Sequence, residues 1–330
     1  EYFMSPESQF EDIKFNLGFD HSPSTLLEWA DTFDLIPKLL EVEEAAFLVP
    51  YYNLLTEIKR LAGIDDKDQF ASFLIANREL VQKYPPDKVL ELICQHSAVA
   101  CATALLESGL DVDINSVYDT VMSPLHMAAH NLSYGMTKVL LDHGADTQLK
   151  LDANGFGTPL STALSAFNKL KYFEQGCTAE NSILKLFYFF CLPELKEPLD
   201  TIRLLASHSH KVEDLCIALM NHGSAQTYAV LLLVAWDKLM VSSAEGGLET
   251  TPVGQHISRG LRNASYLHEI CGFTCDKIIM ERVVKNLTIA WHVVKTMSMT
   301  RGVLERYYHS TAEENLLMVV SAGFSGCNGD

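Results

Sequence analysis

Residues 123–130 read SPLHMAAH, and residues 158–165, 35 positions further along the chain, read TPLSTALS. Between them lies the segment 138–157, KVLLDHGADTQLKLDANGFG. Both octapeptides place a hydroxyl residue before a proline and continue with apolar and small residues at helical spacing. The repeated offset predicts two copies of one helical unit, the second beginning near residue 158.

The start of each unit has the features of a helix N-terminus. The hydroxyls of Ser123 and Thr158 can accept a hydrogen bond from the free backbone amides of a first helical turn. Pro124 and Pro159 follow at the first helical position, where no amide hydrogen is needed. We therefore expect helices to begin at Pro124 and Pro159.

The residues that follow predict a second helix and its end. Residues 139–141, VLL, supply an apolar stripe, and Ala128 and Ala129 are small enough to let neighbouring helices approach closely. Gly144 is expected to end the second helix in a left-handed conformation that other residues resist. Each unit is therefore expected to be a pair of helices followed by a projecting turn.

These features together resemble the ankyrin-repeat family, whose units begin T-P-L-H-x-A and repeat at about 33 residues. The resemblance implies an all-α fold, a solenoid of helix-turn-helix units with short hairpins. His126 occupies a position where ankyrin histidines bridge adjacent units by hydrogen bonds. A structural role, rather than a catalytic one, is expected for it.

The same register places a unit upstream. Residues 102–115, ATALLESGLDVDIN, match the segment that begins at residue 138, and Gly109 takes the position of Gly144. Residues 88–101 keep the apolar spacing of a first helix but lack the Ser-Pro start.

Downstream, the pattern becomes less regular. Leu215 and Ala218, with the apolar run 229–236, indicate a fourth, degenerate unit, and its short distance from the third predicts the loss of the hairpin between them. The third unit carries an insertion near 168–198 that contains the densest aromatic cluster of the chain. We expect this insertion either to carry function or to bury its aromatic side chains against the stack as one extra helix.

About four repeats, at 87–241, thus lie between two other helical segments. Residues 1–86 form an N-terminal segment, closed by Pro85 and Pro86, that is expected to shield the first unit. Residues 242–330 begin with a loop-like stretch and continue as a C-terminal helical cap or small domain. The helices of the N-terminal segment are predicted over residues 38–48, 51–62 and 67–83.

Composition limits the classes of function. The chain has 330 residues, 48% of them hydrophobic, and a formal net charge of -17. That charge argues against direct nucleic-acid binding, for which a basic stripe is expected, and it fits a partner with a basic surface. No apolar stretch approaches the roughly 20 residues of a membrane-spanning helix. Eight cysteines without regular pairing indicate reduced thiols and a cytoplasmic location, and no cofactor is expected.

Three groups of residues are candidates for chemistry, and one of them, His208 with His210, is interpreted as part of a solvated loop and not as a metal site. Cys177 follows Gln175 and Gly176, which is faintly similar to papain-like or caspase-like proteases, but no partner histidine can be identified. His268, Cys271 and Cys275 share one helical face and could ligate zinc with a fourth ligand from elsewhere, although their spacing is also that of a core stripe, the interpretation we favour. A cysteine-dependent hydrolase or transferase, carried by the insertion or the flanking helices, is therefore the main alternative to a binding protein.

The resemblance implies that a partner protein binds at the hairpin tips and at the concave face formed by the first helices. The tips map to residues 111–118 and 146–156, and we expect the insertion to join them in one recognition surface. The expected partner-binding residues are Asp111, Asp113, Asn115, Tyr118, Met127, His130, Asp146, Gln148, Lys150, Asp152, Asn154, Phe156, Phe187 and Phe189.

The irregular units and the long insertion are similar to ankyrin-type effectors that intracellular bacterial pathogens deliver into host cells. That resemblance implies a host protein as partner, in the host cytosol or nucleus. A eukaryotic ankyrin adaptor is the alternative, and both are protein-binding scaffolds.

Overall fold

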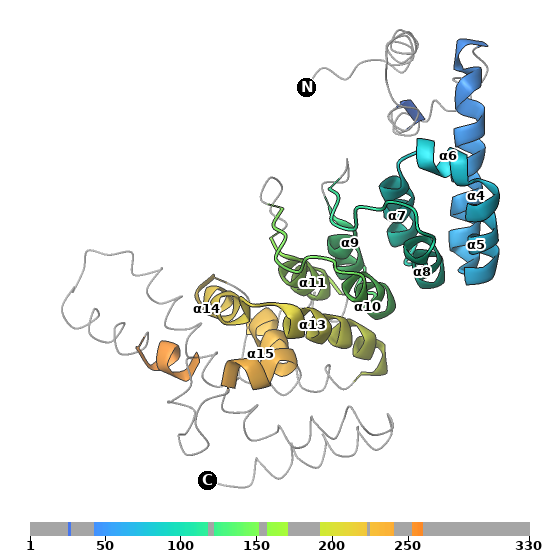
Figure 1. The fold of residues 1–330 in the computed structure, drawn as a ribbon. Coiled ribbons are helices and arrows are strands. Elements are labelled where there is room, and N and C mark those ends of the chain that lie inside the picture. Colours follow the sequence, from blue (N-terminus) through green and yellow to red (C-terminus); the bar gives the residue numbers. More distant parts are fainter. Residues whose placement is uncertain are drawn as a thin grey trace. The chain divides into compact units, whose positions relative to one another are not determined.

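The fold is helical throughout the part of the chain that the structure describes. A computed structural model (Figure 1) describes residues 26–27, 43–117, 122–151, 157–170, 192–222, 225–240 and 253–259. No strand occurs in these residues, which confirms the all-α prediction for them. Within the same residues, no helix combines the length and the apolar character that crossing a membrane requires.

The chain divides into two compact units, and each is described by itself. The first comprises Glu1–Ala128 and Lys138–Ala145, and the second comprises Ala129–Thr137 and Asp146–Asp330. The three segments expected from the sequence, with boundaries at 86 and 241, stay a prediction.

From residue 43 to residue 117, the first unit contains two helix pairs and a short helix between them. After a 3-10 helix, η1 (Glu43–Leu48), its helices are α4 (Val49–Ile64), α5 (Lys67–Ala76), α6 (Arg78–Lys83), α7 (Pro86–Gln95) and α8 (Val99–Glu107). Helices α9 (Pro124–His130) and α10 (Tyr134–Asp142) follow, and the division between the units passes through both.

The two pairs of the first unit pack helix against helix. Helix α4 contacts α7, and α5 contacts α8 (Figure 1). Ile58 of α4 and Phe70 of α5 are fully buried, as are Ile93 of α7 and Leu105 of α8. Burying each such side chain stabilises the fold by about 1.5–3 kcal/mol. The α4–α5 pair therefore belongs to the same core as α7–α8.

The same backbone turn joins the helices of each pair. Asp65, Ser97 and Leu132 have φ angles of 55°, 53° and 53°. Each stands two residues before the first residue of a second helix, respectively α5, α8 and α10. A left-handed residue that is not glycine is uncommon, so its recurrence at one position marks α4–α5 as a pair of the same kind as the two that follow.

Glycine ends the second helix where the sequence predicted it. Gly109 has a φ of 70° and Gly144 a φ of 91°. The amide of Ala145 donates to the carbonyl of Leu140 at 3.0 Å, which closes the end of α10. Both glycine predictions are confirmed, because only glycine adopts this conformation without steric cost.

The predicted helix starts are also confirmed. The Ser123 Oγ accepts from the amide of His126 at 3.4 Å, directly before α9. The Thr158 Oγ1 accepts from the amide of Ser161 at 3.4 Å, and α11 (Pro159–Asn168) begins at the next residue.

Two predicted helices are wrong in their extent. Residues 88–101 form no single helix, because α7 ends at Gln95 and α8 begins at Val99, with the left-handed Ser97 between them. Residues 67–83 likewise divide into α5 and α6 at Asn77, whose side-chain amide donates to the Phe73 carbonyl at 3.0 Å. In both cases the apolar spacing continues across a break in the backbone.

Within its described residues, the second unit contains α11, three later labelled helices and a helical stretch at 253–259. The three labelled helices are α13 (Lys196–His208), preceded by the 3-10 turn η3 (Pro193–Leu195), then α14 (Val212–His222) and α15 (Ala225–Met240). Helix α13 packs on α11 and on α15, and α15 also contacts α14. The helices predicted around Leu215 and over 229–236 are confirmed. Of the expected insertion, residues 171–191 lie outside the described residues.

The connection between α13 and α14 is short, as predicted. Only residues 209–211 separate the two helices. The Lys238 ammonium of α15 donates to the carbonyls of Ala206, Ser207 and Ser209, at 2.9, 2.6 and 3.1 Å. The carbonyls at the end of α13 are thereby satisfied by α15 in place of a projecting hairpin.

Candidate functional site

The loop after α8, residues 110–117, is fixed to the first helix of its own pair. The Asp113 amide donates to the Asp87 carboxylate at 2.7 Å, and Asp87 stands in the first turn of α7. The Asp113 carboxylate in turn accepts from the amide of Asn115 at 3.0 Å. The loop therefore has a defined backbone, and its outward side chains need little ordering when they bind.

This loop presents charge and apolar surface together. Asp111 and Asp113 are exposed, and Val117 has 43% of its surface exposed. Val112 and Ile114, between the charged residues, are half-buried. Such a mixture of exposed carboxylates and an apolar contact suits the surface of a protein partner.

The loop after α10 has a similar local turn. In the second unit, the Asp146 carboxylate accepts from the Gln148 amide at 2.7 Å, and Thr147 donates to the His208 carbonyl at 3.2 Å. Asp146 and Lys150 are exposed, and Gln148 is half-buried. The two loops belong to different compact units, so each is considered alone.

The remaining candidate partner contacts have varied positions. His130, at the end of α9, is exposed. Met127 has 6% of its surface exposed, so it has little area to offer a partner, because its helix packs that face inward. Outside the described residues lie Tyr118, Asp152, Asn154, Phe156, Phe187 and Phe189.

Sequence reasoning missed α6 as part of this region. Arg78 donates to the carbonyls of Ser108 and Gly109, both at 3.3 Å, immediately before the loop that follows α8. The prediction of one helix over 67–83 hid this element. Asn77, a residue typical of helix ends, was the available signal.

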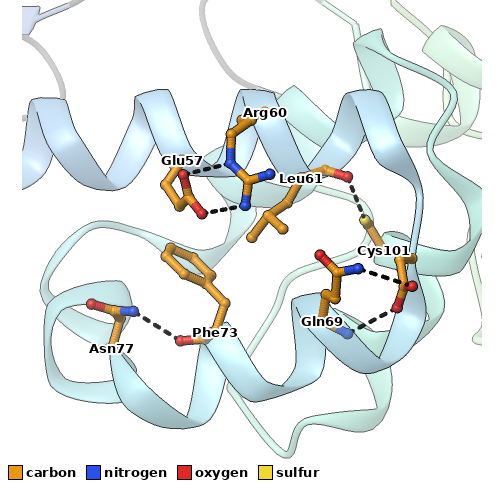
Figure 2. Close-up of polar contacts among 8 residues, drawn as sticks. Glu57, Arg60, Leu61, Gln69, Phe73, Asn77 and Cys101 are labelled. Atoms are coloured by element: carbon orange, nitrogen blue, oxygen red, sulfur yellow. Dashed lines mark hydrogen bonds and ion pairs between the residues drawn. The ribbon is translucent and has the colours of Figure 1, made fainter.

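A groove of about 420 Å³ lies between α4 and α5 (Figure 2). Two of its charged side chains pair with each other, because Arg60 donates to the Glu57 carboxylate through Nε at 2.8 Å and Nη2 at 2.6 Å. The hydrogen bond from Arg60 lowers the pKa of Glu57. Leu61 and Phe73 line the apolar part of the groove. A carboxylate held ionised by its neighbour is a poor general base, so Glu57 is unsuited to that role.

The described thiols are unsuited to nucleophilic catalysis. Cys94, Cys101 and Cys216 are fully buried. Burial raises the pKa of Cys216 to about 12 and, with the nearby charge of Asp65, that of Cys101 to about 12. The Cys101 Sγ donates to the Leu61 carbonyl at 3.6 Å (Figure 2). These thiols are protonated at neutral pH, and thiolate is the nucleophilic form.

Two other candidates for chemistry cannot be placed. Cys177 and the group His268, Cys271 and Cys275 lie outside the described residues. Among the residues that are described, no group of three or more histidine, cysteine, aspartate or glutamate side chains is arranged to hold a metal ion. His126 is fully buried, with its Nδ1 2.7 Å from the Ser123 Oγ, as expected of a structural histidine.

Comparison with known proteins gives one partial relationship. A stretch of 61 residues is 44% identical to the human (Homo sapiens) protein named Ankyrin repeat and SOCS box protein 9. It covers 18% of this chain and 20% of that protein, so the chain matches about a fifth of the relative's length. The match supports an ankyrin-repeat assignment. No family model matches the chain, and no solved structure matches it.

Helices α7 and α8, and likewise α9 and α10, follow each other as pairs, and a loop follows each pair. This order is what an ankyrin repeat requires, with the loops in the place of its hairpin tips. An ankyrin repeat carries no chemistry of its own, so this arrangement suggests a protein-interaction module.

Proposed function

We propose that this chain binds a partner protein, and that the loop at 110–117 is one of its contact sites. The proposal rests on the fixed backbone and the exposed side chains of this loop. Its backbone is held by Asp87, while the carboxylates of Asp111 and Asp113 and the side chain of Val117 face solvent. A fixed loop with exposed polar and apolar groups is favourable for recognition because little conformational entropy is lost on binding.

The charge of the chain supports a partner that carries basic side chains. The chain has 42 acidic and 25 basic residues. Exposed carboxylates speed the encounter with a basic surface and make it sensitive to salt. Asp111 is the best placed to act in this way, since the Asp113 carboxylate already accepts from the loop backbone.

The irregular repeats and the long insertion support a finer proposal, that the partner is a host protein met by a bacterial effector in the host cytosol or nucleus. A eukaryotic adaptor with a cytoplasmic partner is the alternative. Both lead to the same first experiment, because both require a specific protein partner in eukaryotic cells.

The test is affinity capture from eukaryotic lysate, identification by mass spectrometry, and calorimetry with the purified partner. The double variant Asp111→Ala, Val117→Ala is expected to weaken binding by about tenfold, a modest effect for truncating interface contacts. The matched control is Asp68→Ala, which removes an exposed carboxylate from α5. Equal affinity for the unaltered protein and the loop variant, with both folded, would contradict the proposal.

A further inference from the structure

We propose that the contact surface of the first unit continues from the loop at 110–117 onto α6. In this proposal the partner presents an acidic side chain to Lys83 and a basic side chain to Asp111. The inference rests on the proposed function, which it deepens by stating the charge pattern of the partner. We call the combined surface of α6 and residues 110–117 the α6 edge.

The position of α6 in the chain is the first step. Helices α4 and α5 are joined through Asp65, the same left-handed turn that joins the later pairs, and they pack on α7 and α8. The residues between α5 and α7 therefore stand where a projecting tip stands between later pairs. In this pair the tip is replaced by a helix, α6.

Direct contacts then join α6 to the loop. Arg78, the first residue of α6, donates to the carbonyls of Ser108 and Gly109 at the start of the loop. Asp87, which follows α6 by a few residues, accepts from the Asp113 amide at 2.7 Å. Figure 1 shows α6 beside α4 and near the start of α7. One side of this segment is buried through Val81 and Tyr84, at 0% and 2% exposure, so the other side is available.

The available side carries charges that the described residues leave unpaired. Glu79, Gln82 and Lys83 are exposed, and no ion pair engages Glu79 or Lys83 in the described part of the chain. Lys83 stands in the last turn of α6, whereas Asp111 belongs to the loop. The α6 edge thus carries both signs of charge, with Glu79 and the cation Lys83 at opposite ends of α6 and Asp111 on the loop.

This pattern selects among partners. A uniformly basic surface would set its charges against Lys83 and Arg78, and like charges brought together in an interface disfavour binding. A partner with an acidic residue opposite Lys83 and a basic residue opposite Asp111 places an opposite charge against each of these two side chains. The α6 edge therefore fits a partner of mixed charge.

The experiment compares Lys83→Gln and Lys83→Glu with the control Lys138→Gln, an exposed lysine of α10. Calorimetry uses the purified partner obtained above, at several salt concentrations. Loss of one exposed ion pair should weaken binding by about two- to fivefold, and Lys83→Glu should weaken it further. Both Lys83 variants should also show a smaller dependence of affinity on salt. Lys138→Gln should bind as the unaltered protein does.

The outcomes separate this inference from the proposed function. If Lys83→Glu binds as tightly as the unaltered protein while the double variant Asp111→Ala, Val117→Ala binds more weakly, the inference about the α6 edge is overturned and the proposed function stands. If Lys83→Glu binds more tightly, the partner is uniformly basic and the inference is likewise overturned. Failure of the unaltered protein to capture any specific partner overturns both. Unchanged thermal midpoints of the Lys83 variants show that a loss of affinity arises at the surface.

Discussion

At the scale of single residues, left-handed backbone positions organise the helix pairs. Gly109 and Gly144 end second helices, whereas Asp65, Ser97 and Leu132 stand between the two helices of a pair. The glycines could be predicted from the sequence, because glycine is the usual residue at this conformation. The other three carry side chains that give no such signal, so the break between α7 and α8 was missed.

Gly144→Val tests the left-handed helix end. A Cβ built at Gly144 would meet no atom within 4 Å, so the cost arises from the backbone, whose φ is 91°. We expect the free energy of unfolding to fall by about 1 kcal/mol or more, since a β-branched residue resists this conformation. Urea denaturation measures the change. Gly63→Ala is the control, because Gly63 lies inside α4 with open space around it and alanine should be neutral or stabilising there. An unchanged unfolding free energy for Gly144→Val would contradict the assignment.

At the scale of elements, the start or end of a helix could be predicted where the residue type strongly favours that one position in a helix. Pro124 and Pro159, each behind a hydroxyl residue, located α9 and α11. Helix α6 was missed because the apolar spacing continues on both sides of Asn77, which was the only local signal of a break. The contacts of its first residue, Arg78, are with the carbonyls of Ser108 and Gly109, which lie far away in sequence. For the same reason only part of the candidate site could be predicted. The loop at 110–117 follows Gly109, which marks a helix end in the sequence, whereas no comparable residue marks α6.

Lys238→Met tests how the second unit holds its shortest connection. The Lys238 ammonium donates to three carbonyls at the end of α13, and methionine keeps the apolar stem while it removes the donors. Leaving such carbonyls without a donor is expected to cost about 1–3 kcal/mol. Chemical denaturation measures the loss. Lys211→Met, at an exposed lysine beside the same connection, should have little effect. Equal losses for both variants would show that the contacts of Lys238 are unimportant.

At the scale of the whole molecule, the net charge of -17 and the buried thiols both make alkaline conditions unfavourable. Burial raises the pKa of Cys216 to about 12, against an ordinary value near 9.0. Burial also raises the pKa of Tyr228, next to which Cys216 lies. Below pH 9 these groups are protonated in both the folded and the unfolded chain. Between pH 9 and 12 the unfolded chain releases the thiol proton first, so stability falls as the pH rises.

We therefore expect the urea midpoint to decrease steadily above pH 9. A thiol that ionises only on unfolding lowers the unfolding free energy by about 1.4 kcal/mol per pH unit. The Cys216→Ala variant should show a shallower decrease than the unaltered protein, whatever its stability at pH 8. The slopes of unfolding free energy against pH, measured from pH 8 to 10.5, make the comparison. Identical slopes would mean that the Cys216 thiol is not shielded from water in the folded state.

The turn at Asp65 has a consequence for how the chain is made. Its carboxylate accepts from the amides of Ala100 and Cys101 at 2.8 and 3.0 Å, so α8 receives its N-terminal cap from a residue 35 positions earlier. During synthesis Asp65 leaves the ribosome before α8 does, and the acceptor is in place when the helix that requires it emerges. The turn of the α4–α5 pair thus supplies the N-terminal cap of α8 in the next pair. A chain begun at α7 would make α8 with two first-turn amides lacking this cap, and its N-terminal end would fray.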